Sequence, residues 1–127
     1  MNSIVLDSSA VLAVLLGEPG ASLVEQLLGG AMILTVNLAE VATKQLASGV
    51  DLETARQEFD ELGIEVVDFT RGLAEDAAAL AASTKALGLS LGDRACIALA
   101  RRENLPALTA DRAWRDVDVG VRIELIR

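Results

Sequence analysis

The chain has 127 residues, of which 52% are hydrophobic and 24% charged and only two are prolines, so we expect one folded domain over residues 1–127. The formal net charge of −8 argues against a nucleic-acid partner for the chain as a whole, because positive charge drives phosphate binding. The sequence contains no histidine, which excludes the Ser-His-Asp and Cys-His mechanisms, and its one cysteine, Cys96, excludes an internal disulfide.

Membrane and export signals are weak in this sequence. No stretch reaches the roughly 18 uninterrupted apolar residues of a spanning helix, and the start, MNSIVLD, lacks the basic region of a signal peptide. A lone thiol fits a reducing compartment. We therefore expect a cytoplasmic protein that does not contact a membrane.

Short β-rich runs alternate with longer helical patterns along the chain. In chain order, the pattern predicts a strand at 3–6, helices at 9–17 and 21–30, a strand at 32–36, and helices at 37–49 and 51–63, N-capped by Asn37 and Asp51. It then predicts a strand at 64–69, an alanine-rich helix at 70–88 capped by Thr70, a helix at 90–104, and strands at 106–109 and 121–126. The last strand is expected at a sheet edge, because arginine and glutamate alternate there with apolar residues. This alternation predicts an α/β fold with a mostly parallel sheet covered by helices.

Four acidic residues occupy positions where such a sheet binds ligands, at the carboxyl ends of its strands. Asp7 directly follows the first strand, Glu40 lies four residues past the second, and Asp111 lies two residues past the fourth. Asp93 lies in the first turn of the last helix. A helix that precedes a strand is expected to start at the opposite edge, so Asp93 joins the others only if the chain crosses over after the alanine-rich helix.

Each of these acids also has a purely local interpretation, which the sequence leaves open. Asp7 is a possible N-cap for the helix after it. Glu40 and Asp93 each follow a possible capping residue by three positions, as in a capping box. Asp111 is suited to an Asx-turn.

If the four carboxylates converge, their chemistry is constrained. Clustered carboxylates repel one another and need a positive partner. Oxygen ligands without histidine or a cysteine pair suit Mg²⁺ or Mn²⁺, and not zinc. Such an ion activates water and neutralises charge on a phosphoryl group. Asp7 would then be tolerated inside its apolar run because it holds a metal.

Four segments carry a resemblance to a known family. IVLDSSAVLAVLLGEPG, NLAEV, LSLGDRACIALA and LPALTADRAW resemble, in this order and over essentially the whole chain, PIN-domain ribonucleases, and specifically the VapC-type toxins of bacterial toxin–antitoxin pairs. The resemblance implies a PIN-like fold, in which helices flank a five-stranded, mainly parallel sheet in an α/β/α sandwich. It also implies that the acidic residues meet at one end of the sheet.

The same resemblance implies roles for individual residues. The catalytic acids would be Asp7, Glu40, Asp93 and Asp111, of which Asp7 and Asp93 would bind Mg²⁺ directly, with Mn²⁺ as a substitute. Ser9 would support the metal site or the substrate. The implied activity is endoribonuclease cleavage of transfer or ribosomal RNA by a homodimer that a VapB-type antitoxin inhibits.

Basic residues gather at the C-terminal end of the chain. Residues 94–127 contain seven arginines and have a net charge of +2, whereas residues 1–93 have a net charge of −10. Arg94, Arg112 and Arg115 flank two of the four acids and are candidates for contacts with RNA phosphates. The alternative is that Arg112 and Arg115 pair with neighbouring aspartates.

Two other functions remain compatible with the sequence. One is a PIN-like module that binds RNA or protein without cutting it, which the loss of an acid would favour. The other is a metal-dependent phosphatase on a similar sheet.

Overall fold

A five-stranded sheet forms the centre of the molecule, with strand order β3-β2-β1-β4-β5. The computed structural model describes all 127 residues. The strands are β1 (Ile4–Leu6), β2 (Ala31–Leu34), β3 (Glu65–Val67), β4 (Ala107–Thr109) and β5 (Ile123–Leu125). All four pairings are parallel, and β5 lies at an edge. The α/β class, the parallel sheet and the edge position of the last strand are therefore confirmed.

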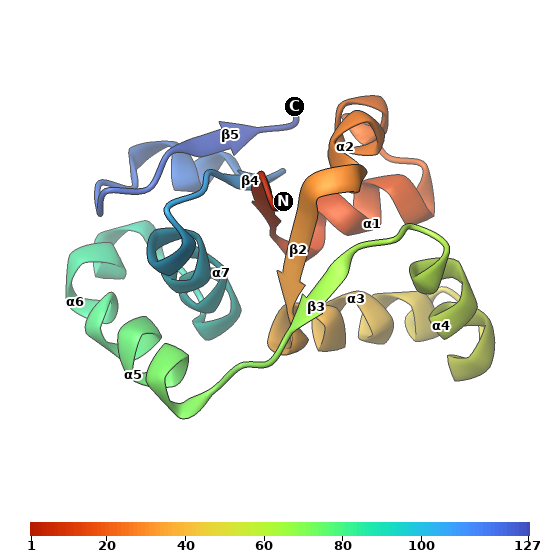
Figure 1. The fold of residues 1–127 in the computed structure, drawn as a ribbon, viewed down its shortest axis with the longest axis horizontal. Helices are drawn as coiled ribbons and strands as arrows, with labels where there is room; N and C mark the ends of the chain where they lie inside the picture. The colour runs from red at the N-terminus through yellow and green to blue at the C-terminus, as the bar shows by residue number, and fades with distance from the viewer.

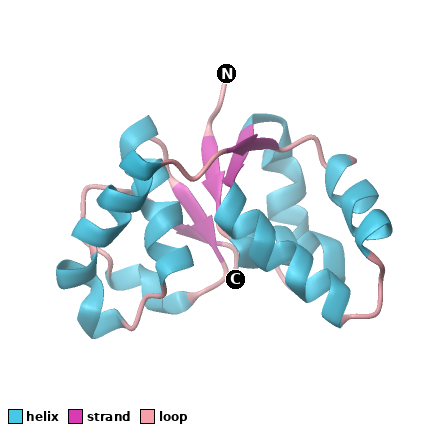
Figure 2. Cartoon of the chain, turned by 90° about the horizontal axis from the view of Figure 1, so that it is seen from below, coloured by secondary structure: helices cyan, strands magenta, loops and turns pink.

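Helices cover both faces of this sheet, as the two views in Figures 1 and 2 show. One group contains α1 (Ser8–Leu16), α2 (Ala21–Leu27), α3 (Thr35–Ala47) and α4 (Leu52–Asp60), and the other contains α5 (Arg71–Ala79), α6 (Ala81–Thr84) and α7 (Leu91–Glu103). Three short 3₁₀ helices complete the chain, η1 (Leu28–Gly30), η2 (Lys85–Leu87) and η3 (Arg112–Asp116). No single helix is long and apolar enough to span a membrane, although the pair Ser8–Leu16 and Ala21–Gly30, bent by 111°, satisfies the length and composition together.

The protein has two hydrophobic cores, one on each face of the sheet, because successive side chains of a strand point to opposite faces. In β1, Val5 packs into a cluster of 14 buried residues on the side of α5 and α7, whereas Ile4 and Leu6 pack into a cluster of 13 on the side of α1. Every residue of the three inner strands is buried. This explains why these strands are continuous apolar runs in the sequence.

The second strand ends earlier than predicted. β2 stops at Leu34, and Thr35 and Val36 belong to the first turn of α3. Leu34, and not Asn37, is the N-cap residue, so the predicted capping role of Asn37 is wrong. Asn37 is instead fully buried within the helix and bonds to α7, a tertiary contact that no local pattern reports.

Two other predicted caps are confirmed, but the helix after the second one is not continuous. Asp51 accepts a hydrogen bond from the Thr54 amide, and Thr70 accepts one from the Leu73 amide. The predicted helix at 70–88 divides at Leu80 into α5, α6 and η2. Leu80 and Thr84 are both buried, and the Thr84 hydroxyl donates to the Leu80 carbonyl one helical turn earlier.

The path of α7 settles where its first turn lies. This helix ends at Glu103, and only three residues separate it from the start of β4 at Ala107. It therefore finishes at the amino edge of the sheet and starts at the carboxyl edge. The expectation that a helix before a strand starts at the edge opposite the other acids is therefore wrong. Asp93 joins the carboxyl edge because α7 runs back along the sheet to reach the start of β4.

Candidate functional site

Asp7 is the buried centre of the site, with 3% of its surface exposed. It occupies the N-cap position of α1, yet its side chain makes no capping hydrogen bond. Its Oδ2 instead accepts hydrogen bonds from Ser9 Oγ at 2.7 Å and from Thr109 Oγ1 at 2.9 Å, while its Oδ1 has no partner. The local capping interpretation of Asp7 is thus excluded, and one buried carboxylate oxygen remains free.

The loop after β4 orients both hydroxyl groups that bind Asp7. The Ala110 amide donates to Ser9 Oγ at 2.9 Å, and the Asp111 amide donates to Thr109 Oγ1 at 3.1 Å. Each hydroxyl accepts from the backbone and donates to the carboxylate, so its proton direction is set. Thr109 was missed in the sequence; the available signal was a hydroxyl residue that ends a buried strand two positions before an acid.

The electrostatics of Asp7 place two other acids close to it. The pKa of Asp7 is raised from 3.8 to about 6, mainly by burial and to a smaller extent by the negative charges of Asp93 and Glu40. The hydrogen bonds from Ser9 and Thr109 act in the opposite direction and lower it. The charges of Asp93 and Glu40 therefore act on Asp7, and we call these three residues the acidic cluster. The sequence pattern had indicated this edge for Asp7 and Glu40 but not for Asp93.

Glu40 reaches this cluster from α3. Its Oε1 accepts a hydrogen bond from Asn37 Nδ2 at 3.0 Å, and its carboxylate lies against Gly92 on α7. No capping box forms here, because Asn37 lies inside the helix. Its partner is the Glu40 side chain, and not an amide at the start of the helix.

Asp93 and Asp111 do take local roles as well. Asp93 forms a capping box with Ser90, whose amide donates to Asp93 Oδ2 at 2.9 Å. Asp111 Oδ1 accepts from the Ala113 amide at 2.9 Å in an Asx-turn that starts η3. Each aspartate uses one oxygen in this way, so the second oxygen of each is free of hydrogen bonds from the protein. Asp111 is exposed and connects to Asp7 only through Thr109.

The donor set fits a hydrated magnesium ion. No three Asp, Glu, His or Cys side chains are close enough together to surround a metal ion. Mg²⁺ usually keeps several waters and binds through one or two carboxylates, so a protein cage is not needed. The unpartnered Oδ1 of Asp7, whose carboxylate is under the influence of the Asp93 charge, is a suitable ligand of this kind.

The three candidate arginines are placed differently. Arg94 Nη1 donates to the Ala77 carbonyl at 2.9 Å, so this side chain joins α7 to α5 and does not face the carboxylates. Arg112 and Arg115 are exposed on η3. Neither forms an ion pair, so the alternative in which they pair with neighbouring aspartates does not occur.

An open depression of about 410 Å³ lies beside Glu40, between α1 and α3. Its lining residues are Ser8, Leu12, Val36, Ala39, Glu40, Thr43 and Lys44. Lys44 is exposed, one helical turn from Glu40, and forms no ion pair. Sequence reasoning did not single it out, although it is the first basic residue of the chain.

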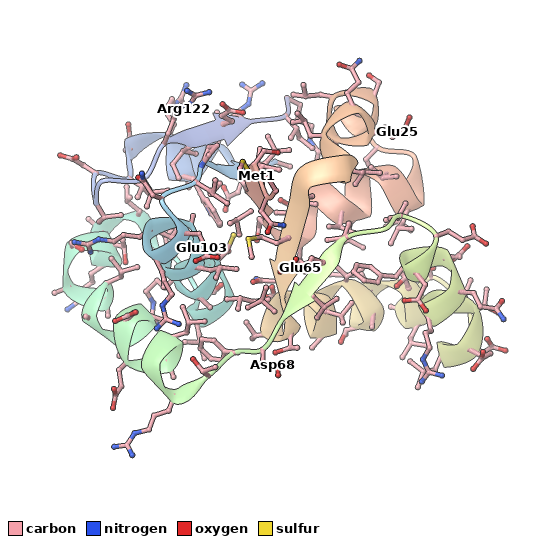
Figure 3. All side chains as sticks on the ribbon, viewed as in Figure 1. Met1, Glu25, Glu65, Asp68, Glu103 and Arg122 are labelled. Atoms are coloured by element: carbon pink, nitrogen blue, oxygen red, sulfur yellow. The ribbon has the colours of Figure 1, made fainter.

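Other acids remain outside the cluster. Asp68 is exposed just beyond the carboxyl end of the edge strand β3, where Figure 3 labels it. Asp116 and Asp118 are exposed in and after η3. None of these three acts on the pKa of Asp7.

Comparison with known proteins identifies the family. The chain belongs to the PIN domain family, whose model matches residues 4–120. No curated protein matches the sequence.

Solved structures share the fold over almost the whole chain. A DNA-bound VapBC complex from Salmonella typhimurium matches with a TM-score of 0.76 at 17% identity and covers 100% of both chains. A toxin–antitoxin complex from Klebsiella pneumoniae matches with 0.75 at 17% identity and 98% of each chain. VapC20 of Mycobacterium tuberculosis, described as a sarcin–ricin loop cleaving toxin, matches with 0.74 at 20% identity, over 94% of this chain and 99% of that one. The five-stranded PIN-like fold expected from the sequence is thereby confirmed.

Proposed function

We propose that this protein is a Mg²⁺-dependent endoribonuclease and the toxin of a bacterial toxin–antitoxin pair. The observation that carries the proposal is the buried carboxylate of Asp7, which keeps one oxygen unpartnered beside the charges of Asp93 and Glu40. An arrangement of this kind is unfavourable for a metal-free protein and favourable when a cation binds.

In this proposal Asp7 and Asp93 hold the ion, and Mn²⁺ can replace Mg²⁺. Glu40 and Asp111 act on it directly or through water. A bound divalent ion supplies an activated water and neutralises charge on the phosphoryl group. The chain itself contributes the geometry, because Ser9 keeps Asp7 Oδ2 occupied and leaves only Oδ1 for the ion.

The RNA backbone is held by exposed basic side chains around the acidic cluster. Arg112 and Arg115 lie on η3, directly after Asp111, and Lys44 lines the depression beside Glu40. All three lack an ion-pair partner and are therefore available to phosphates. Arg94 takes no part in this contact, because its guanidinium group is bound to α5.

The partners of the protein follow from the toxin role. The Salmonella and Klebsiella structures are toxin–antitoxin complexes, and the Mycobacterium relative is described as a toxin that cleaves the sarcin–ricin loop. By analogy, this chain forms a homodimer in the cytoplasm, binds a VapB-type antitoxin and cleaves transfer or ribosomal RNA.

Expression in a bacterial host tests this proposal. The wild-type chain should arrest growth and generate new RNA ends at a few sites in transfer or ribosomal RNA. The Asp7→Asn variant should do neither, although it accumulates to the same level. Growth arrest by both proteins, or arrest without new RNA ends, would contradict the nuclease assignment.

A further inference from the structure

We infer that Asn37 and Gly92 are positioning residues that together hold the Glu40 carboxylate at the start of α7, beside Asp93. The inference rests on the proposed function, since it gives Glu40 a task at a divalent ion. It assigns two neutral residues to the site that the acidic pattern does not include.

Asn37 joins two helices through one amide group. It is fully buried in the first turn of α3, and its Nδ2 donates both to Glu40 Oε1 and to the Gly92 carbonyl oxygen, each at 3.0 Å. The amide therefore uses one proton to hold the Glu40 carboxylate and the other to bind α7, which fixes the carboxylate relative to that helix. Its Oδ1 is buried without any partner. A residue selected for stability alone would avoid that unsatisfied acceptor.

Gly92 provides the space that the carboxylate occupies. A Cβ atom at this position would lie 2.5 Å from Glu40 Oε2 and 2.8 Å from Glu40 Cδ. Gly92 has an ordinary helical backbone, so its conformation does not require glycine. Glycine costs backbone entropy within a helix. The absent side chain is instead explained by the close approach of Glu40.

The Asn37 hydrogen bond and the space at Gly92 counteract the repulsion between the carboxylates. The charges of Glu40, Asp93 and Asp7 disfavour one another, and a half-buried glutamate with free rotamers would turn towards water. The Asn37 donor and the Gly92 gap hold the carboxylate in place before any ion arrives. Without either one, the ion would have to order Glu40 as it binds, which lowers its affinity.

The first experiment compares two glycines at equivalent positions. Gly92 and Gly72 are each the second residue of their helix, α7 and α5. A Cβ at Gly72 would lie 3.0 Å from the flexible end of Arg102 and in ordinary van der Waals contact with Thr70 Oγ1 at 3.9 Å. We expect Gly92→Ala to weaken Mn²⁺ binding at least about tenfold in calorimetric titration without lowering the melting temperature. Gly72→Ala should bind Mn²⁺ like the wild type. Equal Mn²⁺ affinity in all three proteins would overturn the inference.

The second experiment tests whether Asn37 acts through Glu40. Asn37→Leu should weaken Mn²⁺ binding in the wild-type background and have no further effect in the Glu40→Gln background. Additive losses would show that Asn37 acts by another route. If Asn37→Leu does not fold, the Gly92→Ala variant is combined with Glu40→Gln in the same cycle and the same outcomes apply.

A readout without metal separates this inference from the proposed function. In the wild type, the Asn37 side-chain amide protons should exchange with solvent much more slowly than those of the exposed Gln57, and Gly92→Ala should remove this protection. Protection and Mn²⁺ binding without RNA cleavage would refute the nuclease proposal and support the positioning roles. RNA cleavage with an unprotected Asn37 amide, or a wild type that binds no Mn²⁺, would refute the positioning roles.

Discussion

Thr109 Oγ1 lies 2.9 Å from Asp7 Oδ2, although 102 residues separate the two in the chain. The parallel pairing of β1 with β4, in which Leu6 lies opposite Leu108, brings these ends together. Both residues are buried, so the hydroxyl is a defined partner for a carboxylate with only 3% of its surface exposed. The shape of the site thus depends on the register of two strands from opposite ends of the sequence.

Replacing this hydroxyl should damage both stability and activity. Thr109→Val keeps the side-chain volume but removes the donor to Asp7 and the acceptor for the Asp111 amide, so we expect a loss of about 1–3 kcal/mol in urea unfolding and loss of RNA cleavage. Thr84→Val is the matched control, because Thr84 is similarly buried and its hydroxyl donates only to the Leu80 carbonyl and to none of the four acids. It should retain cleavage. Loss of cleavage in both variants would show that removing any buried hydroxyl impairs the protein, and would contradict a specific role of Thr109 at Asp7.

The raised pKa of Asp7 should make the metal-free protein less stable at neutral pH. The pKa of this group is 3.8 in the unfolded chain and about 6 in the folded one, so the folded state binds more protons between these values. Its contribution to stability is therefore complete below pH 4 and is lost as the pH rises through 6. At pH 8 the loss is on the order of 3 kcal/mol.

The Asp7→Asn variant lacks this titrating group, so comparing its unfolding free energy with that of the wild type measures the contribution of Asp7. In EDTA, the variant should gain unfolding free energy over the wild type as the pH rises from 4 to 8, and saturating Mg²⁺ should stabilise only the wild type. Urea unfolding at the two pH values, with and without Mg²⁺, makes the comparison. A difference between the two proteins that does not change with pH would contradict the pKa of about 6.

Most of the fold could be predicted from local patterns. The buried strands are apolar runs, and the capping residues Asp51 and Thr70 mark the starts of their helices. The errors occur where tertiary contacts overrule local preference. Asn37 suits an N-cap but is used inside α3 to bond α7. The predicted helix after Thr70 divides at Leu80, where the alanine-rich sequence indicates no break.

The positions of Asp7, Glu40 and Asp111 at the carboxyl edge were predictable because each follows a strand, whereas Asp93 was expected at the opposite edge. Their neutral partners were not predictable. Thr109 ends a strand, and Asn37 and Gly92 lie in the first turns of helices. Only the strand register and the approach of α3 to α7 bring these three residues to the site. Arg94 shows the reverse case, because its neighbour in sequence lies in the site while its own side chain faces α5.

Lys44 should contribute to RNA binding through charge. Removing one phosphate contact reduces the salt dependence of binding, so the slope of log K against log salt should fall by about 0.7 in Lys44→Ala for single-stranded RNA. Fluorescence anisotropy with a labelled RNA and the Asp93→Asn background, which prevents cleavage, measures this slope. Lys85→Ala, an exposed lysine in η2, is the control and should leave the slope unchanged. Equal slopes for both variants would exclude a contact at Lys44.

Arg94 and Arg115 should differ in the kind of damage they cause. Arg94→Leu loses its hydrogen bond to α5, so we expect a stability loss of about 1 kcal/mol and an unchanged KM for RNA. Arg115→Ala should change stability by less than about 0.5 kcal/mol, because its side chain has no partner, and should raise KM. Thermal unfolding and steady-state cleavage assays distinguish the two. A raised KM in Arg94→Leu would show that the Arg94 guanidinium group contacts the RNA.

The most direct measurement is RNA cleavage by three purified proteins, each with Mg²⁺ and with EDTA. Ser90→Ala breaks the capping box at the start of α7 and keeps the Asp93 carboxylate, whereas Asp93→Asn keeps the side-chain shape and removes the charge. We expect Mg²⁺-dependent cleavage by the wild type and by Ser90→Ala, and none by Asp93→Asn. Cleavage that persists in EDTA or in Asp93→Asn would contradict a carboxylate-bound metal, and equal loss in both variants would reduce Asp93 to a helix cap.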